Sequence, residues 1–337
     1  MKISMKMVLL NLVFLVLISF FSFATGSKET KKSSDPQYSI KIGYVQTEKD
    51  PLTQGLFRMA DELKKKTNGK ILVEVMHSGV LGDTHDVLRQ AQTGMNIGLL
   101  VDAGRFADYV PEIIILDAPY LFNNFNEANK FVKSNLFIEW TKKVIPSGVR
   151  IVAWNYYQGP RHFWTQKEIK SIDDLKNLKI RTTTGPVWQA TVTAFGAKPV
   201  ALPWGELYMA IQQKVVDGAE AQVIGGYGIK LYEVTKYLTK TEHFHLLTGM
   251  AISEKWFQNL PMEYQTLFIN EANQAGEYSS NIVLNKISEV EKEMITKGLI
   301  IKEIDLGPFK EAAEKVYENF KNFTSIRKEI RKIVDSL

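Results

Sequence analysis

Alternating and periodic apolar positions predict a regular succession of strands and helices from residue 39 onward. The segment 39–44 alternates like a strand, and apolar residues repeat at helical spacing from Leu56 to Leu63 before Gly69. The pattern then predicts a strand at 71–76, a helix around Leu88 that ends near Gly94, and a strand at 97–101. This order favours a parallel or mixed sheet with helices on its faces.

The same pattern returns in the second part of the chain. It predicts strands at 149–154, 178–182 and 216–222, and helices at 188–195 and 205–214. Ser171, with Asp174 at the third helical position, is typical of a capped short helix. The glycine-rich segment 225–228 lacks the strand–turn–helix setting of a dinucleotide site, so we expect a flexible loop there.

A long helical stretch at 261–298 contains no internal proline. It is too long for one compact domain, so we expect it to bend or to brace two domains. The chain shows no repeat, no low-complexity tract and no obvious linker. We therefore predict two α/β lobes between which the chain crosses more than once.

Residues 1–24 have the character of a secretory signal peptide. Lys2 and Lys6 precede an apolar run at 7–23, and Ser22 and Ala24 are small residues at a cleavable position. The alternative is a membrane anchor that stays attached, because the run is at the lower length limit for spanning. Residues 25–37 are polar and form a tether, and no later segment is apolar enough to cross a membrane. We expect an exported, periplasmic protein.

Composition narrows the function classes. The 337 residues contain no cysteine, which excludes a disulfide scaffold, a thiolate metal site, a cysteine nucleophile and a lipidated cysteine. The formal net charge of +5 is too small for a nucleic-acid-binding surface. We therefore expect no nucleic-acid partner.

A search for catalytic motifs finds no nucleophile elbow, no phosphate loop and no zinc-binding His-Glu-x-x-His helix. His243 and His245 share one face of a predicted strand, but a third metal ligand is missing nearby. Asp173 and Asp174 are better explained as favourable charges at a helix N-terminus. We expect no enzymatic activity, no cofactor and no metal.

Two arginines are candidates for binding an anion. Arg181 lies at the end of the strand 178–182, and Arg161 follows a strand and a predicted turn at 158–160. In open α/β sheets, ligands bind at the carboxyl ends of the strands, and the planar guanidinium suits a carboxylate. The spacing alone favours the alternative, in which both arginines form surface or structural ion pairs.

Several segments, in order and spacing, resemble the solute-binding proteins of tripartite ATP-independent periplasmic (TRAP) transporters, the DctP-type family. The resemblance covers essentially the whole mature chain. The segments are Gly-Val-Leu-Gly-Asp at 79–83, Ala-Gly-Arg-Phe at 103–106, Asp-Ala-Pro-Tyr-Leu-Phe at 117–122, Leu-Lys-Asn-Leu-Lys-Ile-Arg at 175–181, Gly-Ala-Lys-Pro-Val at 196–200 and Val-Asp-Gly-Ala-Glu at 216–220.

The resemblance implies roles for particular residues. Arg181 matches the family's carboxylate-binding arginine, Arg161 a second arginine at the same carboxylate, and Trp204 an aromatic position against the ligand. Asp102 and Arg105 match polar positions on the opposite lobe of sialic-acid-binding relatives.

This chain departs from those relatives at two positions. Ala221 replaces an asparagine, which leaves Gln222 as the substitute hydrogen-bonding residue, and Thr184 replaces another asparagine-type position. The difference at Ala221 argues against sialic acid as the ligand, and the difference at Thr184 gives this pocket polar contacts of its own. Glu220 completes the candidate contacts in this segment.

Aromatic residues around these positions either stack on a ligand ring or belong to the core. We count Tyr157 among the candidate ligand contacts. The set comprises Trp154, Tyr156, Tyr157, Trp188, Trp204 and Tyr227.

The family fold implied by the resemblance is a two-lobed, type II-like periplasmic-binding-protein fold, with a ligand cleft between the lobes and a long helix spanning both. Lobe I is then expected at 38–158 and 247–286, and lobe II at 159–246 and 287–337. The implied mechanism is capture of an organic acid, with a sugar acid favoured, by an arginine–carboxylate contact and hinge closure. A monomer would deliver this ligand to the TRAP membrane subunits.

Two alternative functions remain open at this stage. One is a ligand-sensing module that presents its closed form to a receptor. The other is an exported enzyme acting on an anionic substrate, for which Glu220 and Asp102 are the candidate carboxylates.

Overall fold

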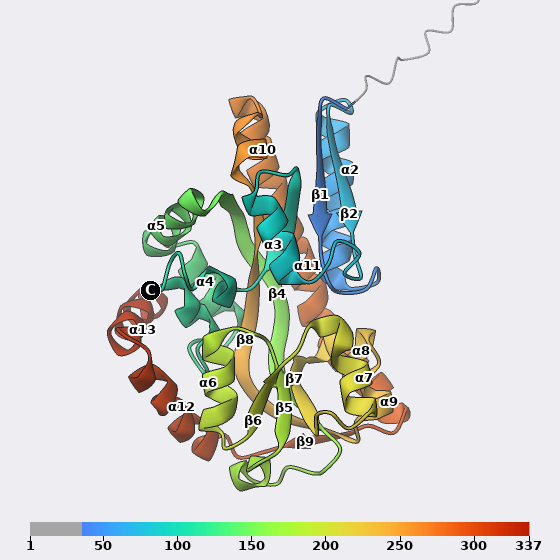
Figure 1. Cartoon of the computed structure of the whole chain (residues 1–337), viewed down its shortest axis with the longest axis vertical. Coiled ribbons are helices and arrows are strands. Elements are labelled where there is room, and N and C mark those ends of the chain that lie inside the picture. The colour runs from blue at the N-terminus through green and yellow to red at the C-terminus, as the bar shows by residue number, and fades with distance from the viewer. Residues whose placement is uncertain (1–35, 337) are drawn as a thin grey trace, which may run out of the picture. The chain divides into compact units, whose positions relative to one another are not determined.

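The computed structural model describes residues 36–336, so the predicted signal peptide and residues 25–35 of the predicted tether lie outside the described residues. Nine strands form a single mixed sheet in the order β2-β1-β3-β8-β4-β7-β5-β6, and β9 pairs with β8 (Figure 1). The strands are β1 (Tyr38–Gly43), β2 (Ile71–Met76), β3 (Ile97–Val101), β4 (Val149–Thr165), β5 (Lys179–Thr182), β6 (Lys198–Ala201), β7 (Gly218–Gln222), β8 (Tyr237–Ser253) and β9 (Ile300–Glu303).

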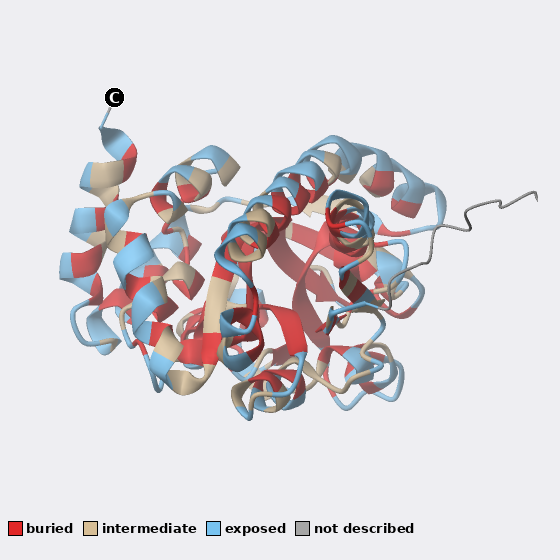
Figure 2. Ribbon diagram, turned by 90° about the horizontal axis from the view of Figure 1, so that it is seen from above, coloured by how far each residue is buried: buried red, intermediate tan, exposed pale blue. Residues whose placement is uncertain are grey.

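The helices cover this sheet. They are α2 (Pro51–Lys66), α3 (Thr84–Gln92), α4 (Phe125–Val132), α5 (Asn135–Val144), α6 (Pro186–Ala194), α7 (Leu207–Gln212), α8 (Val223–Gly228), α9 (Leu231–Val234), α10 (Glu254–Gln258), α11 (Met262–Thr296), α12 (Gly307–Asn319) and α13 (Phe323–Asp335). Short 3₁₀ helices lie at η1 (Ala103–Phe106), η2 (Ile113–Asp117), η3 (Ile145–Ser147), η4 (Ile172–Leu175) and η5 (Trp204–Glu206). Figure 2 shows the buried strands enclosed by helices whose outer faces are exposed.

Two long antiparallel strands, β4 and β8, form the centre of the sheet. On one side they join β3 and, beyond it, the parallel pair β1 and β2. On the other side they join β7, β5 and β6. The sequence predicted β1, β2, β3, β5 and β7 but not β6, and the continuity between the two groups comes from β4 and β8.

The predicted turn at 158–160 is wrong, because β4 continues through these residues to Thr165. Gly159 has a φ of +100°, a left-handed conformation that glycine adopts without a side-chain clash. The pairing register with β8 shifts between Tyr157 and Gly159, so the glycine forms a bulge and the strand does not reverse. Pro160, which lacks an amide N–H, still pairs opposite His245.

Helix α11 confirms the prediction of a long uninterrupted helix at 261–298. It packs against α2 and β4 near one end and reaches α8 and β9 near the other. Its buried face carries small residues, and Gly276 lies so close to β4 that a Cβ atom there would be 2.0 Å from Oδ1 of Asn155. The helix therefore braces both halves of the sheet.

The glycine-rich segment 225–228 lies in helix α8, so the prediction of a flexible loop is wrong. Its glycines permit close packing. A Cβ atom on Gly226 would lie 2.5 Å from the ring of Trp164, and one on Gly225 would lie 2.6 Å from Nε2 of Gln222. The segment is thus a short helix pressed onto β4 and β7.

The predicted lobe boundaries fall inside continuous elements. Gly159 in β4 and Leu246 in β8 face each other in the pairing register, and a Cβ atom on Gly159 would be 3.4 Å from Ile287 of α11. The three predicted crossing points are therefore neighbours in space. Residues 36–336 form one compact unit, so the boundaries between lobe I and lobe II stay a prediction. Within these residues, none of the helices combines the length and apolar character needed to cross a bilayer.

Candidate functional site

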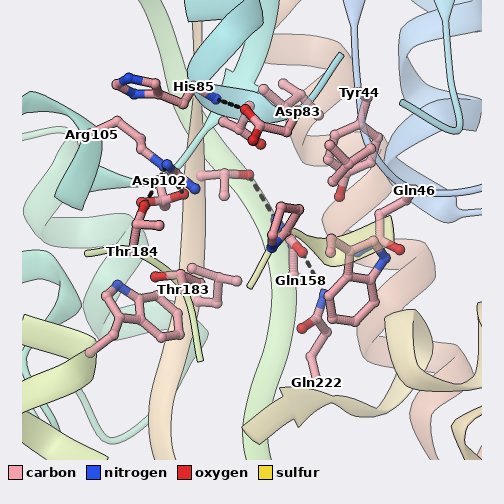
Figure 3. Close-up of a pocket in the computed structure, with 18 of the residues that line it drawn as sticks. Tyr44, Gln46, Asp83, His85, Asp102, Arg105, Gln158, Thr183, Thr184 and Gln222 are labelled. Carbon is pink, nitrogen blue, oxygen red and sulfur yellow. Dashed lines mark hydrogen bonds and ion pairs between the residues drawn. The ribbon is translucent and has the colours of Figure 1, made fainter. Parts of the chain in front are cut away.

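A cavity of about 290 Å³ opens at the carboxyl ends of several strands, where open α/β sheets bind ligands. Its walls come from both halves of the sheet, and Figure 3 shows their polar groups pointing inward. The lining comprises Tyr44, Val45, Gln46, Asp83, Thr84, His85, Leu100, Asp102, Arg105, Gln158, Arg161, Arg181, Thr183, Thr184, Trp188, Leu202, Pro203, Trp204, Gln222, Leu246 and Thr248.

Most of the candidate contacts from the sequence line this cavity. They are Arg161, Arg181, Trp204, Asp102, Arg105, Gln222 and Thr184. Tyr157 and Glu220 do not. The structure thus brings together residues that are far apart in the sequence, including both arginines.

Arg181 offers the free end of its guanidinium to the cavity. Its Nε and Nη2 both donate to the backbone oxygen of Leu202, at 3.0 and 2.8 Å, so one edge of the group is held. Within residues 36–336 its buried Nη1 has no hydrogen-bond partner. Burial lowers the pKa of Arg181 to about 10, so it stays charged at neutral pH. The guanidinium also lies over the indole of Trp204, 5.4 Å from its centroid.

Arg161 is held more completely. Its Nε donates to the carboxylate of Glu220, Nη1 donates to Oε1 of Gln222 at 2.6 Å, and Nη2 donates to the backbone oxygen of Glu220 at 2.6 Å. The face of the guanidinium lies 4.6 Å from the ring centroid of Trp188. Its position is fixed before any ligand arrives, and few of its N–H groups remain free.

Glu220 supports Arg161 from behind and is fully buried in β7. Burial raises the pKa of its carboxyl, but the charge of Arg161 and the hydrogen bond that Arg161 donates outweigh this, and the pKa falls to about 2. Thr182 donates to its second oxygen at 2.7 Å. Glu220, predicted as a ligand contact, is a positioning residue because Arg161 lies between it and the cavity.

Tyr157 points away from the cavity into the core. Its hydroxyl hydrogen-bonds Nδ1 of His245 at 2.8 Å, and its ring packs on Phe125 with 5.0 Å between centroids. Successive side chains of a strand face opposite sides, so Gln158 reaches the cavity where Tyr157 does not. Trp154 and Tyr156 are likewise buried outside the cavity lining, whereas Trp188 lines it.

Asp102 and Arg105 follow β3 and form part of the opposite wall. Nε of Arg105 lies 3.4 Å from Oδ2 of Asp102, and its Nη1 donates to the hydroxyl of Thr184 at 2.7 Å. That second bond joins the segment after β3 to the segment after β5 (Figure 3). Oδ1 of Asp102 is buried, and within the described residues no group donates to it.

The sequence did not single out the amides and hydroxyls of Gln46, Gln158, Thr183 and Thr248, nor Tyr44 and His85. Tyr44 and Gln46 directly follow β1, and Thr183 directly follows β5. The rule that ligands bind at the carboxyl ends of strands could have identified these three. Gln158 and Thr248 lie in the middle of β4 and β8, and the sequence alone gives no signal for them.

The arrangement can bind one anionic group and several polar ones. Arg161 and Arg105 each contact a carboxylate, whereas Arg181 contacts none within residues 36–336. Among those residues, no three His, Asp or Glu side chains are grouped as a metal site, and His243 and His245 lie outside the cavity lining. The site thus presents an anion-binding arginine surrounded by hydrogen-bonding groups.

Residues 42–325 match the profile of a protein family described as bacterial extracellular solute-binding protein, family 7, or DctP. The chain is similar to the 2,3-diketo-L-gulonate-binding periplasmic protein YiaO of Escherichia coli, with 24% identity over 297 residues, 88% of this chain and 90% of that protein. It is also similar to the ectoine-binding periplasmic protein TeaA of Halomonas elongata, with 29% identity over 301 residues, 86% of this chain and 87% of that protein.

Solved structures of TRAP periplasmic solute-binding proteins have the same fold. One from Ochrobacterium anthropi with bound L-fuconate is 31% identical, with a TM-score of 0.86 over 88% of this chain and 99% of that one. An apo open structure from Escherichia fergusonii is 35% identical, with a TM-score of 0.77 over 88% and 99%. A complex with diglycerolphosphate from Desulfovibrio salexigens is 30% identical, with a TM-score of 0.84 over 89% and 97%.

Proposed function

We propose a ligand for this chain, starting from its family. The chain belongs to bacterial extracellular solute-binding protein family 7 and is a TRAP-type solute-binding protein, not an enzyme. It has the type II-like periplasmic-binding-protein fold. The ligand is a sugar acid that carries a single carboxylate. Arg181 binds that carboxylate, with Arg161 beside it, and the polar cavity walls bind the hydroxyl groups.

The observation that carries this proposal is the unpaired end of Arg181. A buried guanidinium with a free Nη1 loses hydrogen bonds to water that no group in residues 36–336 replaces. A carboxylate can accept two parallel N–H bonds there, and its charge compensates the one cavity arginine that has no acidic partner among residues 36–336. A ligand with a single negative charge therefore suits this site.

The rest of the cavity favours a ligand rich in hydroxyl groups. Gln46, Thr184 and the free Oδ1 of Asp102 can exchange hydrogen bonds with hydroxyls, and Trp204 provides an apolar face. The similarity to the L-fuconate complex and to the diketogulonate-binding protein supports this ligand class. The similarity to the diglycerolphosphate complex makes a phosphate ester the natural competitor.

The transport step follows from the family. We propose that the chain is exported by means of residues 1–24, that its two halves close over the ligand by a hinge motion, and that the closed monomer delivers the ligand to TRAP membrane subunits. β4, β8 and α11 are the segments that would bend.

Calorimetric titration tests the ligand class. We expect one-to-one binding of a hexonate or hexuronate and no binding of the corresponding neutral hexose. A thermal-shift screen across organic acids identifies the tightest member, because a ligand that binds only the folded state raises the melting temperature. Tight binding of sn-glycerol 3-phosphate with no binding of any sugar acid would overturn the proposal.

A further inference from the structure

A chain of hydrogen bonds runs along the cavity wall away from Arg161. Nη1 of Arg161 donates to Oε1 of Gln222 at 2.6 Å. Nε2 of Gln222 donates in turn to Oε1 of Gln158 at 2.7 Å (Figure 3). Nε2 of Gln158 then lies 3.5 Å from the hydroxyl of Thr248, which donates to the backbone oxygen of Tyr156 at 3.1 Å. The four side chains in this chain are buried.

The groups at the two ends of this series of hydrogen bonds determine which atom of each side chain donates and which accepts. A guanidinium only donates hydrogen bonds, so Gln222 must turn its oxygen toward Arg161 and its nitrogen toward Gln158. A backbone carbonyl only accepts, so Thr248 must use its hydrogen on Tyr156 and can only accept from Gln158. Gln158 therefore turns its amide oxygen toward Gln222 and its amide nitrogen toward Thr248. If the Gln158 amide were rotated by 180°, its nitrogen would face the nitrogen of Gln222, and its oxygen would face the hydroxyl oxygen of Thr248, which has no hydrogen left to donate.

As a consequence, the cavity wall around Gln158 has more hydrogen-bond donors than acceptors. Nε2 of Gln158 has a second hydrogen for which residues 36–336 supply no acceptor, and its bond to Thr248 is long at 3.5 Å. Its one oxygen already accepts from Gln222. A ligand atom that approaches the free side of this nitrogen therefore meets an N–H donor.

We propose that Gln158 selects the oxygen on the ligand carbon next to the carboxylate, and that it favours an oxygen that carries no hydrogen. Only Gln222 separates it from Arg161, which places its contact close to the arginine-bound group. In a pyranose uronate that oxygen is the ring oxygen, an acceptor only. In an aldonate it is a hydroxyl, whose hydrogen would face a wall of donors.

This inference rests on the proposed sugar-acid function and narrows it to uronates, together with 2-keto acids. A buried hydroxyl hydrogen without an acceptor weakens binding by about tenfold. We therefore expect D-glucuronate to bind about tenfold more tightly than D-gluconate, an acid with the same number of carbons and the same charge.

The substitution Gln222→Glu tests whether the orientation of the Gln158 amide determines the preference for glucuronate. A carboxylate at 222 accepts from both Arg161 and Gln158, so Gln158 turns its nitrogen toward residue 222 and its oxygen toward the cavity. The hydroxyl of Thr248 then turns away from the backbone oxygen of Tyr156 and donates to the oxygen of Gln158. We expect the glucuronate-to-gluconate affinity ratio to fall toward one or below. His85→Glu is the matched control, since it adds the same charge to the cavity lining outside the hydrogen-bond chain. Both acids carry one negative charge, so this control should weaken both alike and preserve the ratio.

Gln158→Leu provides a variant without a charge change and is expected to abolish the preference by weakening glucuronate alone. Circular dichroism and thermal melts of each variant confirm that it is folded. An unchanged ratio in both Gln222→Glu and Gln158→Leu would overturn this inference and leave the sugar-acid function intact. Failure of the parent protein to bind either acid would overturn both.

Discussion

Arg161 and Arg181 are the same residue type in one cavity, yet their surroundings give them different tasks. Arg161 contacts Glu220, Gln222 and Trp188, and it organises the wall. Among residues 36–336, the side chain of Arg181 donates hydrogen bonds only to the backbone oxygen of Leu202, and it keeps donors free. Substitution of Arg181 should therefore change ligand affinity, whereas substitution of Arg161 should also change the stability of the fold.

Replacement of Arg181 should reduce ligand affinity in a graded way. Arg181→Lys keeps the charge but loses the planar pair of donors, which corresponds to roughly 1.5–3 kcal/mol or about ten- to hundredfold weaker binding. Arg181→Ala should be weaker still, because the ligand carboxylate is desolvated without a partner. Calorimetric titration with the best sugar acid checks the order, and parental affinity in Arg181→Ala would contradict the assignment.

Replacement of Arg161 should also destabilise the fold. Arg161→Ala leaves the Glu220 carboxylate buried without its cation, which costs about 3–5 kcal/mol. Adding Glu220→Gln removes the buried charge and should recover part of the loss. Chemical denaturation of the single and double variants measures both effects. Equal stability of Arg161→Ala and the parent would show that the carboxylate gains little from Arg161.

Acid sensitivity follows from the same pair. The pKa of Glu220 is about 2 in the folded protein, against an ordinary value of 4.5. Its contribution to the free energy of unfolding is therefore complete above pH 4.5 and is lost as the pH falls toward 2. Compared with Glu220→Gln, the parent should lose stability more steeply over that interval in pH-dependent melts. Parallel curves would contradict the low pKa.

At the scale of elements, close packing of α11 on β4 depends on Gly276. A Cβ atom there would lie 2.0 Å from Oδ1 of Asn155, whose Nδ2 is held by the backbone oxygen of Asn273. Gly276→Ala should cost about 1–3 kcal/mol by forcing the helix and the strand apart. Gly205→Ala is the control, because a Cβ atom on Gly205 meets nothing within 4 Å. Equal melting temperatures of the two variants would contradict the packing argument.

Strands and helices were largely predictable where the spacing of apolar residues within the segment itself indicates the element. β2 and β3 were predicted at the residues where they occur, and α11 nearly so. The continuation of β4 was not, because Gly159-Pro160 resembles a turn and only pairing with β8 keeps it extended. Likewise, the glycines of α8 resemble a loop until Trp164 lies against them.

The site was predictable where a residue type carries its own chemistry. An arginine at a strand end is a candidate for binding an anion, so the sequence singled out Arg181, which lines the cavity. The roles of Gln158 and Thr248 depend on a hydrogen-bond chain that joins residues from β4, β7 and β8. Glu220 was misplaced as a ligand contact, since only the folded sheet reveals that Arg161 covers it.

At the scale of the molecule, the predicted crossing points meet around Gly159, Leu246 and Ile287. Bending at this one place would move the two halves of the sheet relative to each other and change access to the cavity. Small-angle scattering should therefore give a smaller radius of gyration when a saturating sugar acid is added. Arg181→Ala should not show this change at the same concentration. An unchanged radius in the parent would contradict hinge closure.

The two indoles beneath the arginines also give this protein an optical property. Trp188 and Trp204 line the cavity with a guanidinium over each ring, whereas Trp140, Trp154, Trp164 and Trp256 are buried outside its lining. An anion that binds the arginines changes the electric field across the first two rings. The emission of the remaining four is then a constant background, so occupancy can be followed by intrinsic fluorescence in the unlabelled protein.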